Sequence, residues 1–143
     1  MTFLREIKRR KLHLVAAVSL TFIGIIAVIS NMPADTFSRA QVSEGLMLSS
    51  EAKAAVTEYY VDHDQFPADN VTAGLPPATN IQGKYVSSIE IVTGEIVVTY
   101  GNDANSDIHG NTLIIQPEIS GQSVTWVCFS LDIVPKNVPH ACR

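Results

Sequence analysis

The stretch SRAQVSEGLMLSSEAKAAVTEYYVDH, residues 38–63, decides the fold because its apolar residues repeat with the period of one long amphipathic helix. At about 100° per residue, one broad face of that helix is almost entirely apolar. It carries Val42, Gly45, Leu46, Leu48, Ala52, Ala55, Val56, Tyr59 and Tyr60. Glu44, Glu51 and Glu58 recur at a spacing of seven and are predicted to line the opposite, solvated side. An isolated helix of this length is marginal in water, so another part of the chain must cover its apolar face.

Local sequence signals mark both ends of this helix. Ser38 and Gln41 have the spacing of a capping box, and Phe37 and Val42 have the spacing of a hydrophobic staple. Pro67 follows a polar run and cannot continue a helix. We therefore predict a helix that begins at Ser38 and ends before Pro67.

Four short β-strand patterns follow the helix, at residues 84–92, 95–100, 112–116 and 123–129. Thr93-Gly94 is a tight hairpin signal, and Ser120-Gly121-Gln122 marks a second turn. Each strand offers one largely apolar face, so we predict an α+β fold in which a four-stranded antiparallel sheet packs on the helix. The helix residues expected in this interface are Val42, Leu48, Ala52, Val56 and Tyr59. Residues 67–83 are predicted to be a long surface connection.

The first thirty residues have the pattern of a membrane anchor. Residues 12–29 contain no acidic and no permanently basic side chain, and a run of this length is enough to cross a bilayer. Four basic residues come directly before the run: Lys8, Arg9, Arg10 and Lys11. The positive-inside rule places them in the cytoplasm. The predicted order is a cytoplasmic basic segment at 1–11, a transmembrane helix at 12–30, a linker at 31–37 and a globular domain at 38–143.

A cleaved signal peptide is the alternative for the same segment. Val28 and Ser30 are small enough to precede a cut site. The apolar run is longer than the usual core of a signal peptide, which favours the retained anchor.

The part of the chain beyond the apolar run is acidic. Residues 31–143 contain five Lys and Arg residues against thirteen Asp and Glu residues. A surface with this charge repels phosphate, which disfavours non-specific binding of nucleic acid.

Both cysteines, Cys128 and Cys142, lie in this exported part. An oxidising compartment favours a disulfide between them, which would close a loop of about 15 residues and contribute ~3 kcal/mol. Cys128, Asp132 and His140 contain the residue types of a thiol nucleophile, its orienter and its base. Pairing of the two cysteines would remove the thiol, so we predict no catalytic site.

Two polar runs have residue types that bind metals. Residues 103–107 contain D-x-N-x-D, the opening of many calcium loops, but Ile108 stands where such a loop needs glycine. Asp62, His63 and Asp64 are consecutive at the expected end of the helix, where polar residues are common. We predict no metal site and no cofactor.

Several segments resemble one known family. The helix and following loop, RAQVSEGLMLSSEAKAAVTEYYVDHDQFPADN (39–70), resemble those of type IV pilins of the N-methylphenylalanine kind. GKYVSSIEIVTGEIVVTY (83–100), GNTLIIQPEISGQSVTWVC (110–128) and PKNVPHACR (135–143) are similar to the strands and the cysteine-closed C-terminal segment of the same family. The resemblance implies a helix on an antiparallel sheet and an exposed, disulfide-bounded loop. In the family, such subunits polymerise into filaments that serve adhesion, twitching motility and DNA uptake.

The N-terminus departs from this family. Pilins carry a processing site of the Gly-Phe-Thr-Leu-Ile-Glu type, whose glycine is the cut point and whose glutamate helps to register subunits. The run MTFLREIKRRKLHL (1–14) lacks the glycine, and no acidic residue occurs between Glu6 and Asp35. The protein is then either a pilin-like relative held in the membrane or a chain with an exchanged N-terminal block that assembles poorly.

The first functional hypothesis is a structural one: a subunit or accessory protein of a type IV pilus system, anchored in the bacterial inner membrane. A second, thin apolar stripe on the helix supports this hypothesis, and it consists of Met47, Ala54 and Val61. A stripe with this spacing suits helix-to-helix contact. The expected partners are other pilin subunits or pilus assembly proteins in a homo- or hetero-oligomer. Nucleic acid is disfavoured by charge but compatible with a role in DNA uptake.

The second hypothesis is a monomeric, membrane-anchored periplasmic binding module. In this case the 67–83 loop and the Cys128–Cys142 loop would bind a partner. Binding residues are often found in loops that a rigid sheet holds in place. Oligomerisation through the helix would discriminate between the two hypotheses.

Overall fold

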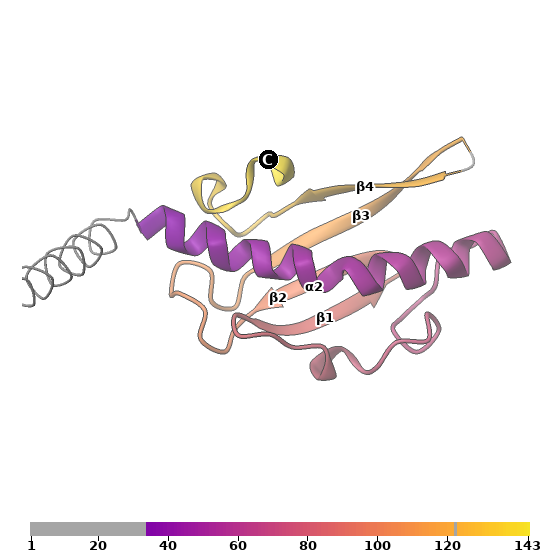
Figure 1. The fold of residues 1–143 in the computed structure, drawn as a ribbon, viewed down its shortest axis with the longest axis horizontal. Helices are drawn as coiled ribbons and strands as arrows, with labels where there is room; N and C mark the ends of the chain where they lie inside the picture. The colour runs from indigo at the N-terminus through magenta and orange to yellow at the C-terminus, as the bar shows by residue number, and fades with distance from the viewer. Residues whose placement is uncertain (1–33, 122) are drawn as a thin grey trace, which may run out of the picture. The chain divides into compact units, whose positions relative to one another are not determined.

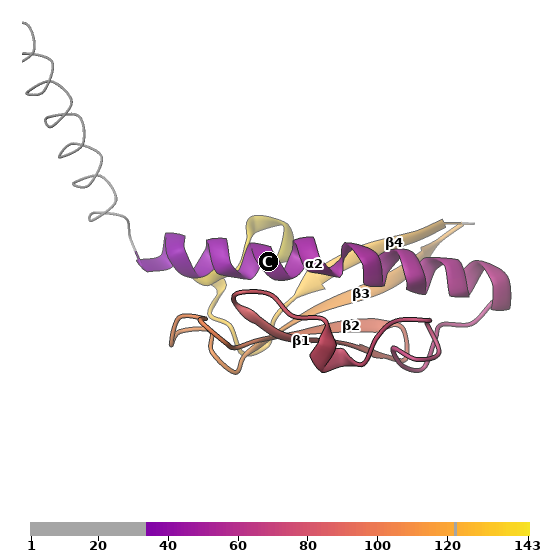
Figure 2. The same cartoon turned by 60° about the horizontal axis from the view of Figure 1, so that its bottom comes forward.

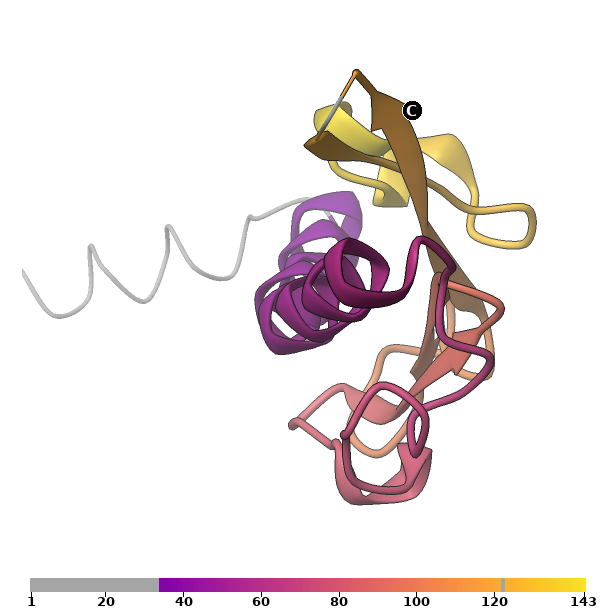
Figure 3. The same ribbon diagram turned by 90° about the vertical axis from the view of Figure 1, so that its right-hand side faces the viewer.

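The computed structural model of the protein describes residues 34–121 and 123–143. One long helix, α2 (Ala34–His63), precedes four strands, β1 (Val86–Val92), β2 (Glu95–Tyr100), β3 (Thr112–Ser120) and β4 (Ser123–Phe129). Three short 3₁₀ helices complete the described part: η1 (Ala78–Asn80), η2 (Pro135–Asn137) and η3 (His140–Cys142). The strands form one antiparallel sheet in the order β1-β2-β3-β4, and α2 lies along one face of it (Figures 1, 2 and 3). The predicted helix on a four-stranded antiparallel sheet is confirmed.

The predicted basic segment at 1–11, the transmembrane helix at 12–30 and the alternative signal peptide lie outside the described residues. Within the part that the structure describes, no helix combines the length and the apolar character needed to span a bilayer.

The predicted start of the helix is wrong. α2 begins at Ala34 and so includes residues 34–37, which the sequence pattern assigns to a linker. Ser38 lies inside the helix, where it is fully buried, and Gln41 accepts a hydrogen bond from the backbone N–H of Asn105 (2.8 Å). Phe37 is 46% exposed and forms no staple. Both residues of the supposed cap therefore serve tertiary packing, which overrides the local signal.

The core lies between α2 and the sheet. Along α2 the buried positions alternate in steps of four and three residues: Ser38, Val42, Gly45, Ser49, Ala52 and Val56. From the sheet, eight fully or almost fully buried side chains meet them: Val86, Ile89, Ile91, Ile96, Val98, Tyr100, Leu113 and Ile115. The period of the helix and that of the strands thus bury one face of each element against the other.

Gly45 sets how closely the helix approaches the sheet. A Cβ atom there would lie 2.8 Å from Cγ1 of Val98 and still closer to the hydroxyl of Tyr100. That hydroxyl donates a hydrogen bond to the backbone carbonyl of Val42 (2.8 Å). Burial, with a smaller contribution from the charge of Glu44, raises the pKa of Tyr100 well above its ordinary value.

Two irregularities explain why the strands do not show a strict alternation. A β-bulge between Val86 and Ser88 shifts the register of β1, so that Val86 and Ile89 both face the core. β3 continues to Ser120, beyond its predicted end at residue 116, although Pro117 lacks a backbone N–H. The strand tolerates this proline because the pairing with β2 stops at Ile115.

Candidate functional site

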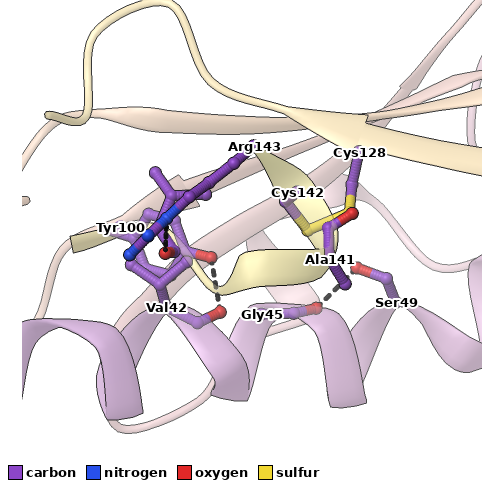
Figure 4. The surroundings of a disulfide bond; sticks show 9 residues. Val42, Gly45, Ser49, Tyr100, Cys128, Ala141, Cys142 and Arg143 are labelled. Carbon is purple, nitrogen blue, oxygen red and sulfur yellow. Dashed lines mark hydrogen bonds between the residues drawn. A yellow bond between two sulfur atoms is a disulfide. The ribbon is translucent and has the colours of Figure 1, made fainter. Parts of the chain in front are cut away.

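The predicted disulfide joins Cys128 at the end of β4 to Cys142 in η3, with a Cα–Cα distance of 4.5 Å. Cys142 is buried, and the bond lies near Gly45 and Ser49 on the covered side of α2 (Figure 4). The bond leaves no thiol at Cys128, and Asp132 binds Thr112 instead of orienting a base. These residues therefore do not form the thiol site that their types suggest.

The disulfide is not the only restraint on the C-terminal segment. Ile133 and Val138 are 4% and 3% exposed, so the segment has a small apolar core of its own. The carboxylate of Asp132 accepts hydrogen bonds from the backbone N–H of Thr112 (3.0 Å) and from its hydroxyl (3.2 Å). These contacts hold the segment in place together with the cross-link.

Two guanidinium groups meet at one point of this segment. Arg39 of α2 donates to the backbone carbonyl of Lys136 (2.8 Å), and Arg143 donates to the same oxygen (3.4 Å). Arg143 also donates to the carbonyl of Val138 (3.0 Å). We call Arg39 and Arg143 the arginine pair. Their hydrogen bonds go to backbone carbonyls and, for Arg143, also to the ring of His140.

The connection at residues 67–83 lies on the other side of α2 and is tied to the sheet. Asn70, only 5% exposed, donates to the carbonyls of Pro76 and Ile89 (3.0 Å each) and accepts from the N–H of Ile91 (2.6 Å). The backbone N–H of Thr93 also donates to the loop, at the carbonyl of Ala68 (3.0 Å). These bonds fix the loop against the free edge of β1, as a neighbouring strand would.

An open groove of about 480 Å³ lies between the last turns of α2 and residues 72–75 of this loop. Its α2 wall carries the carboxylates of Glu51, Glu58 and Asp62. None of the three has a hydrogen-bond or ion-pair partner among the described residues. We call this feature the carboxylate groove.

The predicted acidic stripe on α2 is correct for only two of its three members. Glu51 and Glu58 are exposed, but Glu44 is half-buried and accepts hydrogen bonds from the backbone N–H groups of Lys84 (2.7 Å) and Tyr85 (2.8 Å). Glu44 therefore anchors the chain that enters β1 and does not face solvent.

Four of the five α2 residues predicted to pack on the sheet do so, and one does not. Val42, Ala52 and Val56 are buried in the core, and Leu48 is half-buried against it. Tyr59 lies outside the core, because its ring stacks on that of His63 with 4.0 Å between centroids. The residue run 62–64, considered for metal binding, thus supplies a stacking partner at the helix end.

The second predicted stripe of α2 is exposed. Met47 is 75% exposed and Val61 is 71% exposed, and Ala54 between them is also exposed. Ala40, one further step of seven towards the N-terminus, is exposed as well and was not among the predicted residues. We call Met47, Ala54 and Val61 the exposed stripe. It lies on the side of α2 opposite the residues that pack on the sheet.

The other metal-like run, 103–107, is part of the connection between β2 and β3. Asn105 accepts from the N–H of Asp107 (3.2 Å) within this connection, and Ile108 is fully buried in the core. Across residues 34–121 and 123–143, no three His, Cys, Asp or Glu side chains are grouped in a way that could hold a metal ion.

Comparisons with known proteins agree with this architecture. A family model for pilin, a bacterial filament protein, matches residues 38–143. A fimbrial protein of Neisseria meningitidis serogroup A is 38% identical over 112 residues, which are 76% of this chain and 65% of that protein. The type IV major pilin PilE of Neisseria gonorrhoeae is 37% identical over 112 residues, again 76% of this chain and 66% of the relative. The chain thus spans just under two thirds of the length of these Neisseria relatives.

A third relative is matched over more of its length. The fimbrial protein EcpC of Eikenella corrodens is 35% identical over 131 residues, which are 87% of this chain and 83% of that protein. The fold, the C-terminal disulfide, the family model and these relatives lead to one conclusion: the chain belongs to the type IV pilin family.

Proposed function

We propose that the protein is a structural subunit, or a membrane-anchored accessory protein, of a type IV pilus system. Such a protein acts in filament assembly, adhesion, motility or DNA uptake. The observation that carries the proposal is the exposed stripe, since a helix that buries one face on its own sheet has no intramolecular use for a second apolar face.

The exposed stripe is the proposed contact to neighbouring subunits. Large apolar side chains that stay in water are favourable to bury, at about 25 cal/mol per Å² of apolar surface. Met47 and Val61 are the largest side chains of the stripe, and a spacing of seven suits contact between nearly parallel helices.

For the first thirty residues we propose a retained anchor at 12–30, with residues 1–11 in the cytoplasm and the domain in the periplasm or at the cell surface. The basic block followed by an uncharged apolar run supports this orientation. An intact-mass measurement on the native protein separates a retained anchor from a cleaved signal peptide.

The assembly proposal is tested by shearing surface filaments from cells and probing them for this chain. We expect wild-type protein in the sheared fraction and little or none for Met47→Asp, because the charge would be buried in the helix contact. Val71→Asp is the matched control, since Val71 is also 75% exposed but lies in the loop after α2. Equal incorporation of both variants would contradict the role of the exposed stripe.

A binding module that stays in the membrane is the second candidate. The restraints on its two loops favour it: Asn70 fixes the loop after α2, and the disulfide fixes the C-terminal segment. Loops held in this way suit recognition of a partner. Wild-type protein found only in the membrane fraction would favour this function over the filament subunit.

A further inference from the structure

We propose that the free edge of β4 is a binding site for an extended peptide segment of another polypeptide, which adds to the four-stranded sheet as one more strand. The backbone groups of Val124 and Trp126 form the site. The inference goes beyond the proposed function, since it applies to a filament subunit and to an accessory protein alike. Only the choice of partner rests on the proposed membrane anchor.

The pairing of β4 with β3 determines which backbone groups point to the open side. The carbonyl of Glu118 faces β4, because it accepts a hydrogen bond from the hydroxyl of its paired residue Thr125 (3.2 Å). In an antiparallel pair, residues that bond to the neighbouring strand alternate with residues whose N–H and C=O point away from it. Thr125 therefore bonds to β3, whereas Val124 and Trp126 direct their backbone groups to the free edge. The pairing of Trp126 with Pro117 agrees with this alternation, because proline has no N–H to donate to β4.

The two edges of the sheet differ in how these groups are satisfied. The N–H and C=O groups of Val124 and Trp126 have no hydrogen-bond partner among residues 34–121 and 123–143. β4 is the last strand of the sheet, and the C-terminal segment lies beside only its end (Figure 1). At the opposite edge, the side chain of Asn70 bonds to both the carbonyl of Ile89 and the N–H of Ile91. The domain thus closes the edge at β1 and leaves the edge at β4 open.

The open edge lacks the features that usually prevent pairing with another chain. Free edges are commonly protected by charged side chains, prolines or bulges. Residues 119–131 contain no Asp, Glu, Lys or Arg, and β4 contains no proline. The pairs of β3 and β4 follow one another from Ile114–Phe129 to Ser120–Ser123 without a shift in register. β4 is therefore suited to accept a strand, and its uncharged surroundings favour a partner segment without charges at the paired positions.

The side chains beside this edge define the kind of segment that fits. Val124 and Trp126 lie on the same side of the sheet as the buried Ile115, and Val124 is paired with Ile119, which is 49% exposed. An apolar side chain opposite Val124 or Trp126 would lie on this side and remove apolar surface from water. On the other side Thr125 is exposed, which suits small polar residues at the alternate positions. The fitting ligand is an uncharged, proline-free segment in which Val or Ile alternates with Thr or Ser.

A second copy of this chain is a poorer partner for the edge. Extension of the sheet from β4 of one copy to β1 of the next is blocked by Asn70. Two β4 edges would pair as antiparallel strands about a two-fold axis, so the two α2 helices would run in opposite directions. Chains anchored in one membrane by residues before α2 do not take that arrangement. The partner is therefore a different polypeptide.

The test uses the fluorescence of Trp126, the single tryptophan of the chain. The full chain, purified in detergent micelles, would be titrated with the synthetic peptide Lys-Thr-Val-Thr-Val-Thr-Lys, blocked at both ends. We expect a saturable shift of the emission to shorter wavelength, because the added strand removes water from the half-buried indole ring. Wild-type protein without a saturable shift would overturn the inference.

Removal of single N–H groups tests whether the peptide binds as a strand. The same peptide with N-methylated valines keeps its side chains but cannot donate to β4, and it should bind about tenfold more weakly. Val124→Pro removes an outward N–H of the protein and leaves the bonds to β3 in place, so it should weaken binding by a similar factor. Val124→Thr is the matched control, because it also replaces the apolar side chain but keeps the N–H. Circular dichroism would verify the fold of both variants. Equal affinity of the two peptides for the wild-type chain would overturn the inference, whether or not the proline variant folds.

Thr125→Cys distinguishes the two partners. In a two-fold pair of β4 edges that aligns Val124 with Trp126 of the second copy, the two side chains at position 125 face each other. We expect no disulfide-linked dimer of this variant in membranes. A dimer that Val124→Pro abolishes would assign the edge to a second copy and overturn the choice of partner.

The outcome is separable from that of the proposed function. The titration needs no filaments, so its failure would leave the role in a pilus system untouched. Absence of the chain from sheared filaments would contradict the role as a filament subunit and leave the peptide site in place.

Discussion

Asn70 acts as a short substitute for a β-strand at the edge of the sheet. Its side-chain amide satisfies the carbonyl of Ile89 and the N–H of Ile91, the backbone groups that β1 presents to its open side. An edge closed in this way cannot pair with another chain. Asn70 also begins an Asn-Val-Thr sequence, the pattern of a glycosylation acceptor, but the buried and fully bonded amide is closed to modification in the folded domain.

Replacement of Asn70 by alanine should destabilise the domain by about 2–3 kcal/mol, because it leaves two buried backbone groups, at Ile89 and Ile91, and the partly buried carbonyl of Pro76 without this partner. Asn80→Ala is the control, since Asn80 is exposed in η1. Thermal unfolding of the purified full chain measures the difference. An Asn70→Ala variant as stable as the control would show that water replaces the amide at no loss.

Because of Tyr100, we expect the stability of the domain to vary with pH in the alkaline range. The pKa of its hydroxyl is raised in the folded state, mainly by burial, and returns to about 10 on unfolding. The folded state therefore holds the proton more tightly than the unfolded state, and stability decreases as the pH rises above about 10. Tyr100→Phe should unfold with a weaker pH dependence between about pH 10 and 12, at the expense of the hydrogen bond to Val42. An unchanged alkaline slope would assign the effect to other groups.

At the scale of elements, the disulfide and the side-chain contacts hold the C-terminal segment together. Cys142→Ser should lower the free energy of unfolding by ~3 kcal/mol, the value expected for a loop of this size. The helix and sheet should stay folded, and the segment should stay partly docked through the bonds from Arg39 to the Lys136 carbonyl and from Thr112 to Asp132.

Limited proteolysis of this variant provides the measurement. We expect new cleavage within residues 130–143 and none in α2 or the strands. Cleavage at the wild-type rate would mean that the contacts alone hold the segment.

The regular elements could be predicted from the sequence wherever local signals and packing agree. β2 and β4 have the predicted bounds, because turn residues flank each strand and their apolar faces are clear. β3 is longer than predicted, because Pro117 was read as a residue that ends a strand. The strand continues through it because that position has no partner on the β2 side. The cap at Ser38 failed because its side chain turns into the core instead of closing the helix.

The candidate site was predictable only in part. Helical periodicity identified the exposed stripe of α2, and the compartment identified the disulfide. The arginine pair could not be predicted, because Arg39 and Arg143 are far apart in the sequence and meet through a backbone carbonyl. The bonds of Asn70 and Glu44 were missed for the same reason, since side chains that bind distant backbone groups leave no periodic signal.

At the scale of the whole domain, α2 has three different surroundings. One side packs on the sheet, and two sides are flanked by the C-terminal segment and by the loop after the helix (Figure 3). These two sides carry opposite charges. The exposed stripe between them is apolar, so the free part of α2 offers an apolar line bordered by unlike charges. This arrangement suits repeated contact between copies of the same chain.

Burial of the exposed stripe on assembly can be measured as a loss of its chemical accessibility in filaments. Met47→Cys and Val71→Cys variants of the full chain would be treated with a maleimide without reduction, in sheared filaments and in membranes. If the stripe is buried on assembly, the thiol at position 47 reacts in membranes and is protected in filaments, whereas the thiol at position 71 reacts in both. Equal labelling of position 47 in the two fractions would contradict it.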